Sequence, residues 1–106
     1  MLGIDIVEEE MKKQNNRNKI IADILREREC QDEKWGYPQN NSLAEWGSLI
    51  AEEIGELCKE LNDMHFIGSN AEMLERMSTE AIQVAALAMS IIEHGELAAS
   101  ISGGKW

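Results

Sequence analysis

Residues 79–92 read Thr-Glu-Ala-Ile-Gln-Val-Ala-Ala-Leu-Ala-Met-Ser-Ile-Ile, and this stretch decides the fold. Between Val84 and Ile92 only Ser90 is polar, so a helix built from this stretch is apolar nearly all round. Such a helix lies at the centre of a bundle or in a subunit interface. Two neighbouring helices leave part of its circumference uncovered. The sequence therefore predicts an antiparallel helical bundle with three main helices, whose four-helix core is completed by homodimerisation.

Outward from this stretch the sequence predicts an all-α chain, because helix-forming residues dominate and β-branched residues are sparse. Ser42 and Glu45 form a capping-box pattern before the second helix, and Gly95 is the predicted stop of the third. The three predicted helices cover residues 18–33, 43–62 and 71–93. The remaining predicted segments are an N-terminal extension at 1–17, connections at 35–41 and 63–70, and a tail at 102–106.

The length and the hydropathy pattern predict one soluble domain. The 106 residues suffice for a single domain, residues 1–106. The longest uninterrupted apolar run, Val84 to Met89, is far shorter than the ~20 residues that a membrane span needs. The N-terminus lacks the basic flank and apolar stretch of a signal peptide. We therefore expect a cytoplasmic protein with no membrane partner.

The charge balance excludes one class of partner. Acidic residues outnumber basic residues by 20 to 10, which gives a net charge of −10. Binding to duplex DNA or RNA needs a basic face that displaces counterions, and no such face can be assembled here. The acidic excess is typical either of a cation site or of an ordinary solvated surface. Cys30 and Cys58 are predicted to be reduced, and His65 and His94 are predicted to lie on the surface.

Three glutamates lie close together in the second predicted helix: Glu52, Glu53 and Glu56. Residues three apart on a helix are neighbours, so Glu53 and Glu56 share one face at the edge of the apolar stripe. A divalent cation would offset their repulsion, although an ordinary acidic face has the same pattern. Gly55 costs about 1 kcal/mol relative to alanine inside a helix, which predicts the close approach of a ligand or another backbone.

Glu80 and Gln83 are polar residues in the apolar third helix. A polar pair in such a helix needs a partner inside the protein. If the second and third helices pack antiparallel, this pair faces Glu53 and Glu56, and three carboxylates and one amide oxygen meet in one site. Hard oxygen ligands of this kind suit Mg²⁺ or Mn²⁺. A ferritin-like di-iron site is disfavoured because neither helix has a Glu-x-x-His pattern.

These motifs resemble those of the MazG-like all-α nucleoside triphosphate pyrophosphohydrolases, in their compact phage and bacterial form. The family signature is ExxE on one helix and ExxD on the next. Glu53-Ile-Gly-Glu56 matches the first half, and Glu80-Ala-Ile-Gln83 matches the second half except at its last position. The segment Arg28-Glu-Cys-Gln-Asp-Glu-Lys-Trp-Gly36 is similar to the one that precedes the first family motif. The resemblance covers residues 20–93.

The resemblance implies Mg²⁺-dependent hydrolysis of a nucleoside or deoxynucleoside triphosphate between its α- and β-phosphates, with Mn²⁺ as a substitute ion. The products are a monophosphate and pyrophosphate, and the role is the removal of unwanted nucleotides; phosphoribosyl-ATP and dUTP hydrolysis stay open within the superfamily. Carried over by position, Glu53, Glu56 and Glu80 are metal ligands, with Gln83 in the fourth place. For Glu52, the adjacent acid, two roles stay open: a water-mediated metal contact, or the catalytic base.

Gln83 leaves one alternative open, because an amide oxygen binds Mg²⁺ more weakly than a carboxylate does. The chain would then be a non-catalytic helical dimerisation or nucleotide-binding module with a degenerate metal site. Both hypotheses predict a homo-oligomer, and a dimer and a tetramer both fit.

Five residues are candidates for contacts with the nucleotide. Lys34 and Lys59 lie near the motifs and are candidates for phosphate contacts, although surface positions fit them equally well. Trp35, in a loop with glycine and proline, is a candidate for stacking on a base. Trp46 lies in the apolar stripe, which favours the core over a base contact. Gln31, one turn before Trp35, is a candidate for reading a base edge.

Overall fold

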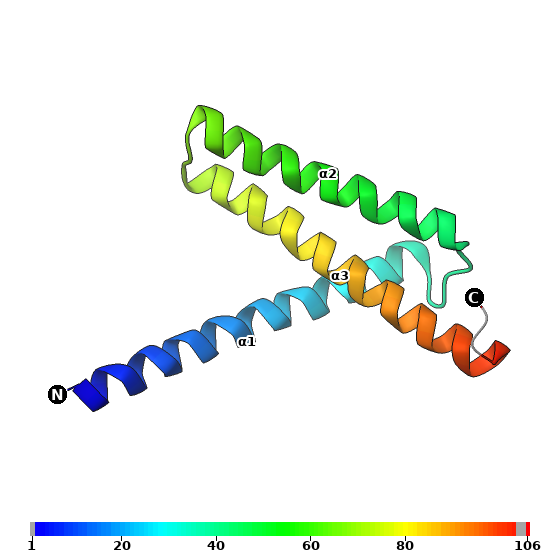
Figure 1. Cartoon of the computed structure of the whole chain (residues 1–106), viewed down its shortest axis with the longest axis horizontal. Helices are drawn as coiled ribbons and strands as arrows, with labels where there is room; N and C mark the ends of the chain where they lie inside the picture. Colours follow the sequence, from blue (N-terminus) through cyan, green and yellow to red (C-terminus); the bar gives the residue numbers. More distant parts are fainter. Residues whose placement is uncertain (1, 104–105) are drawn as a thin grey trace.

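The computed structural model describes residues 2–103 and 106, and its secondary structure is helical. Those residues contain three helices and no strand: α1 (Leu2–Trp35), α2 (Leu43–Ile67) and α3 (Ala71–Ser102) (Figure 1). The predicted all-α class with three main helices is therefore confirmed.

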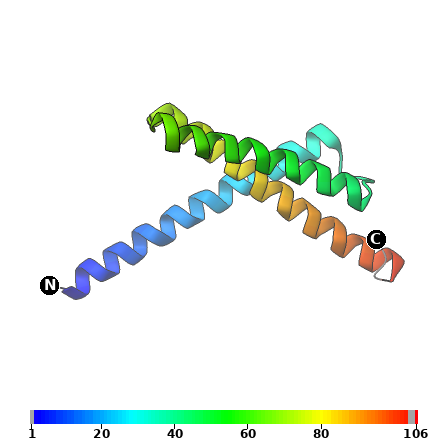
Figure 2. The same ribbon diagram turned by 45° about the horizontal axis from the view of Figure 1, so that its top comes forward.

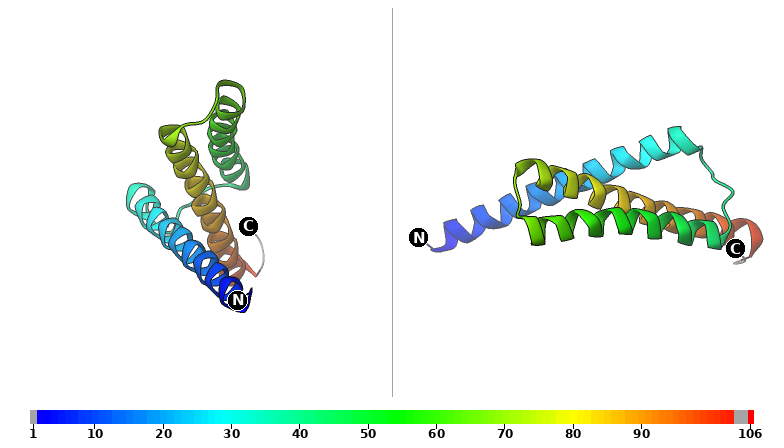
Figure 3. Two further views of the ribbon diagram at one scale, coloured as in Figure 1. Left: turned by 90° about the vertical axis from the view of Figure 1, so that its left-hand side faces the viewer. Right: turned by 90° about the horizontal axis from the view of Figure 1, so that it is seen from above.

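The stretch that is apolar nearly all round lies in α3, and both other helices pack on α3. α2 runs antiparallel beside α3, whereas α1 crosses α3 obliquely (Figures 1 and 2). Among the described residues, no Cα atom of α1 lies within 8 Å of a Cα atom of α2. The N-terminal half of α1 extends away from the other two helices (Figure 3). This packing is compatible with a bundle in which α3 is the central helix.

Each helix is longer than predicted. Residues 2–17, which were expected before the first helix, form the first turns of α1. Helix-forming residues dominate there, and Lys13 Nζ lies 2.9 Å from Glu10 Oε1 one turn earlier. α3 runs through Gly95 and ends at Gly103, which has the left-handed φ of 69° typical of a helix C-terminus. The predicted stop at Gly95 is therefore wrong.

Gly95 makes room for an aromatic side chain instead. A Cβ atom at this position would lie 2.7 Å from Cζ3 of Trp106. The missing side chain lets the Trp106 ring lie directly against α3, so the constraint on Gly95 comes from packing and not from the end of a helix. Of the predicted tail at 102–106, residues 104 and 105 lie outside the described residues.

The starts of α2 and α3 follow the predicted capping chemistry. Ser42 Oγ accepts a hydrogen bond from the Glu45 backbone N–H at 3.1 Å, and Glu45 Oε1 accepts one from the Ser42 N–H at 3.1 Å. The predicted capping box is confirmed. Asn70 caps α3, because its side-chain oxygen accepts a hydrogen bond from the Met73 N–H at 2.8 Å.

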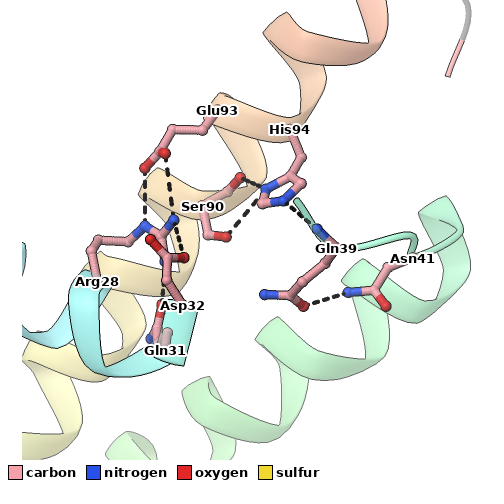
Figure 4. A network of polar contacts seen from close by, with 8 residues as sticks. All are labelled: Arg28, Gln31, Asp32, Gln39, Asn41, Ser90, Glu93 and His94. Carbon is pink, nitrogen blue, oxygen red and sulfur yellow. Dashed lines mark hydrogen bonds and ion pairs between the residues drawn. The ribbon is translucent and has the colours of Figure 1, made fainter. Parts of the chain in front are cut away.

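His94 is buried, so its predicted surface position is wrong. Because α3 continues past Gly95, residue 94 stays on the buried face of the helix, one turn after Ser90. The Gln39 N–H can only donate, so Nε2 of His94 accepts its hydrogen bond at 2.9 Å and Nδ1 donates to the Ser90 carbonyl at 2.7 Å (Figure 4). The rings of Tyr37 and Trp46 lie 5.2 and 4.9 Å from the His94 ring. His94 thus ties the loop between α1 and α2 to α3.

The predictions for His65, the two cysteines and Trp46 are confirmed. His65 is exposed, and Cys30 and Cys58 are free cysteines, as predicted. Trp46 is 3% exposed and belongs to the core.

One helix is long and apolar enough to span a membrane, judged by length and composition alone. In the part of the chain that the structure describes, this helix is the segment Ala71–Ile101 of α3, with a mean hydropathy of 1.3 over its most apolar window. The length of the longest uninterrupted apolar run did not reveal this segment, because single polar residues interrupt its apolar sequence. The same composition is typical of the central helix of a soluble protein, and α3 carries both α1 and α2.

Candidate metal centre and adjoining cavities

Three carboxylates from two helices converge on one point. Glu53 and Glu56 lie one turn apart on α2, and Glu80 lies on the neighbouring α3. One oxygen from each of them lies within 4.8 Å of the others. The antiparallel packing of α2 and α3, with a connection of only three residues between Ile67 and Ala71, sets this register.

Two oxygens of this cluster are buried and unsatisfied. Oε2 of Glu53 and Oε2 of Glu80 are inaccessible to solvent and have no hydrogen-bond partner among the described residues. A buried carboxylate oxygen without a donor is costly, so it needs a proton or a cation. Carboxylate oxygens are the ligands that Mg²⁺ and Mn²⁺ prefer, so the donor set fits a divalent cation.

The electrostatics of Glu53 reflect burial and crowding. Burial raises the pKa of Glu53, and repulsion from Glu56 and Glu52 raises it further. The ammonium group of Lys34 acts in the opposite direction, because it favours the charged form of Glu53.

Glu80 is perturbed in the same direction. Burial raises its pKa, and the hydrogen bond to Glu56 and repulsion from Glu56 and Glu53 raise it further. In the metal-free protein, burial and crowding therefore shift the equilibrium of both acids towards their protonated forms. A bound cation would reverse this preference.

Gln83 and Glu52 line different cavities. Gln83 lies one turn after Glu80 and, with Glu53, lines a cavity of about 230 Å³ between the three helices, which we call the inner cavity. Glu52 lines a larger cavity of about 670 Å³, which we call the outer cavity, between α2 and the loop after α1.

Three of the five candidates for nucleotide contacts reach the inner cavity. Gln31, Lys34 and Trp35 come from the last turns of α1 and line it together with Glu53. Trp35 also lines the outer cavity, so its ring borders both cavities. Lys34 Nζ lies 5.1 Å from the centre of the Trp35 ring, in cation–π range.

The other two candidates lie elsewhere. Lys59 is 76% exposed, its Nζ lies 4.0 Å from Oδ2 of Asp63, and it lines neither cavity. Trp46 is packed against His94 in the core, which is the alternative that its place in the apolar stripe favoured.

Gly55 does not bring another part of the protein close. A Cβ atom at this position would meet nothing within 4 Å among the described residues. Gly55 lies at the surface of α2, so no other backbone of the described chain approaches it, and the expected approach of a ligand stays a prediction.

Arg28 was missed by the sequence analysis. It is only 4% exposed, and its guanidinium group lies between Glu93 on α3 and Asp32 on α1. Ile24, Arg28 and Gln31 are spaced by four and three residues, which places all three on the face of α1 that meets α3. This spacing was the available signal, because an arginine on such a face needs acidic partners.

Known proteins give no further guidance on the site. Comparison of the chain with models of protein families, with curated proteins and with solved structures finds no match.

The raised pKa values predict an unusual pH dependence of stability. In the unfolded chain a glutamate titrates near pH ~4.3. Because the folded protein holds the Glu53 proton to higher pH, the folded state binds more protons in the window above that value, and stability falls as pH rises through it. We expect Glu53→Gln to raise the Tm of the metal-free protein above that of the wild type at pH 7, by about 3 °C or more. At pH 4 the difference should be much smaller.

Thermal melts between pH 4 and pH 8 in the presence of a chelator measure this difference. Glu29→Gln, on the exposed side of α1, is the matched control and should follow the wild type at every pH. If the Tm of Glu53→Gln differs from the wild-type Tm by the same amount at every pH, the acids do not repel one another in the folded protein.

Proposed function

We propose that the chain is a Mg²⁺-dependent nucleoside triphosphate pyrophosphohydrolase of the MazG-like kind, which clears unwanted nucleotides from the cell. It would cleave a nucleotide between the α- and β-phosphates to give the monophosphate and pyrophosphate. The observation that carries this proposal is the convergence of Glu53, Glu56 and Glu80 from α2 and α3, with two buried oxygens left unpaired. The resemblance of the two motifs to the family signature supports the same reaction.

Each acid has a role in this reaction. Glu53, Glu56 and Glu80 would hold the ion, with Gln83 as a neutral fourth ligand. Bound there, Mg²⁺ would neutralise phosphate charge and lower the pKa of a coordinated water. Glu53 and Glu52 are the two acids that can accept the proton of the attacking water. Glu53 belongs to the cluster, whereas Glu52 lines the outer cavity.

The two cavities suit the two parts of a nucleotide. The inner cavity adjoins the acid cluster through Glu53 and carries the ammonium group of Lys34, which suits phosphates. The outer cavity is larger, and its loop wall carries the amide side chains of Gln39 and Asn41, which suits a base and a sugar. Trp35 borders both cavities, and its exposed ring would stack on the base.

The test of this proposal is the release of pyrophosphate from a panel of ribo- and deoxyribonucleoside triphosphates with Mg²⁺ or Mn²⁺. We expect turnover of at least one nucleotide, and we expect Glu53→Gln to lower kcat by about 10²-fold or more, because it removes a ligand and a base. Glu29→Gln should keep the wild-type rate.

The alternative is a helical dimerisation or nucleotide-binding module with a degenerate site, and Gln83 in the place of a fourth acid is the feature that favours it. Absence of turnover on every nucleotide, together with absence of Mg²⁺ binding, would favour this module over the enzyme.

We further infer that the protein is a homodimer or a tetramer built from dimers. One chain exposes 7778 Å². A compact monomer of 11.9 kDa exposes roughly 6,000 Å². The difference, roughly 1,800 Å² per chain, matches what a subunit buries in an obligate interface. Large apolar side chains are exposed at both ends of the molecule, including Val7 and Met11 on α1 and Ile92 and Ile101 on α3.

The mass in solution tests this inference. Light scattering at micromolar concentration should give two or four times 11.9 kDa. Met11→Glu places a charge on the exposed apolar side of α1 and should shift the protein towards the monomer, whereas Lys12→Glu, beside it on the polar side, should not. A wild-type mass of one chain would contradict the inference.

A further inference from the structure

Arg28 is held in one orientation by two carboxylates from two helices. Its Nε donates to Oε1 of Glu93 at 2.9 Å, and Nη2 lies 3.4 Å from Oε2 of the same residue and 2.9 Å from Oδ1 of Asp32 (Figure 4). A guanidinium group with two such partners is planar and fixed. These partners outweigh the effect of burial and raise the pKa of Arg28, so it stays charged.

The fixed guanidinium group orients the side chain of Gln31. Nη1 of Arg28 donates to Oε1 of Gln31 at 3.2 Å. Arginine has only donors, so the atom that it binds must be the amide oxygen, and the amide nitrogen of Gln31 points away from Arg28. Among the described residues, no acceptor lies against this nitrogen.

Gln31 is 4% exposed and lines the inner cavity, together with Lys34 and Glu53. Its amide nitrogen keeps access to solvent and has no acceptor among the described residues, so it is free to donate to an acceptor atom of a ligand in that cavity.

The inner cavity favours a phosphate as this ligand. It adjoins Glu53 of the metal cluster, and Lys34 is its one cationic lining residue within the described part of the chain. Its volume of about 230 Å³ suits a chain of phosphates, whereas the outer cavity leaves room for the base. Because Glu27 and Glu53 also line the inner cavity, the phosphates would enter as a complex with Mg²⁺.

We propose that Gln31 donates a hydrogen bond to a phosphate oxygen of the nucleotide, and that Arg28, held by Glu93 and Asp32, is the residue that positions Gln31. This inference rests on the proposed function. It assigns Gln31 to the phosphates, where the sequence suggested a base edge. It also gives a role to the buried ion pairs between α1 and α3, which lie outside the acid cluster.

The experiment is calorimetric binding of Mg²⁺-pyrophosphate, which has phosphates and no base. Gln31→Met keeps the size of the side chain and removes the donor, and we expect it to raise Kd by about tenfold or more, because a hydrogen bond to a charged acceptor is lost. Gln31→Glu keeps the oxygen for Arg28 and replaces the donor by a negative charge, so we expect a larger rise. Gln14→Met, on the exposed part of α1, is the control and should bind as the wild type does.

The positioning role has its own variant. Arg28→Lys keeps a positive charge for Glu93 and Asp32 but cannot also hold Gln31. We expect it to raise Kd several-fold and also to lower the Tm, because lysine cannot keep both hydrogen bonds to Glu93. With a hydrolysable nucleotide, all three Gln31 and Arg28 variants should raise KM more than they lower kcat.

The outcomes separate this inference from the proposed function. A wild-type protein that binds no Mg²⁺-pyrophosphate and hydrolyses no nucleotide would overturn both. A wild-type protein that binds it, with Gln31→Met and Gln31→Glu binding equally well, would overturn this inference alone. If Arg28→Lys has the wild-type Kd while Gln31→Met has a raised Kd, Arg28 does not position Gln31. The contact between Gln31 and the phosphate would then still hold.

Discussion

The packing of α1 and α2 on α3 is the constraint on which the rest of the structure depends. Ala86 and Leu87, at 0% and 3% exposure, lie at the middle of α3, and within the described residues no Cα atom of α1 lies within 8 Å of a Cα atom of α2. The partner that each polar residue of α3 meets is therefore set by the position of that residue around the helix. Glu80 faces α2, Glu93 faces α1, and His94 faces the loop between them.

Glu93 and His94 on this apolar helix have partners that offset the cost of burial, whereas Glu80 does not. Glu93 pairs with Arg28, and His94 is hydrogen-bonded through both ring nitrogens. Glu80 meets only other acids, Glu53 and Glu56, and two carboxylate oxygens in this cluster stay unpaired. Repulsion between buried acids lowers stability unless protons or a cation offset it. A cluster of this kind fits a binding site better than a structural contact.

The spacing of residues in the sequence predicted the acid cluster, but not its surroundings. Glu53 and Glu56 share a face because they lie three residues apart, and a short connection forces α2 and α3 to be antiparallel, so local rules sufficed. The role of Arg28 depends on which helix α1 crosses, and the role of Gly95 depends on the ring of Trp106. Neither role can therefore be predicted from the residues that are adjacent in the sequence. The lengths of the helices were underestimated because glycine and asparagine favour helix ends, yet Gly95 lies inside α3 against the Trp106 ring and Asn15 and Asn16 lie inside the exposed part of α1.

The binding of Mg²⁺ to the nucleotide-free protein, measured by isothermal titration calorimetry, tests most directly whether the cluster is a metal site. Wild-type protein should bind Mg²⁺ with a defined stoichiometry, and Glu80→Gln, which takes away the ligand from α3, should weaken binding at least about tenfold, a loss of about 1.4 kcal/mol. Gln83→Asp should bind more tightly, and Glu29→Gln should bind as the wild type does. Equal binding by all four proteins would contradict a metal site at Glu53, Glu56 and Glu80.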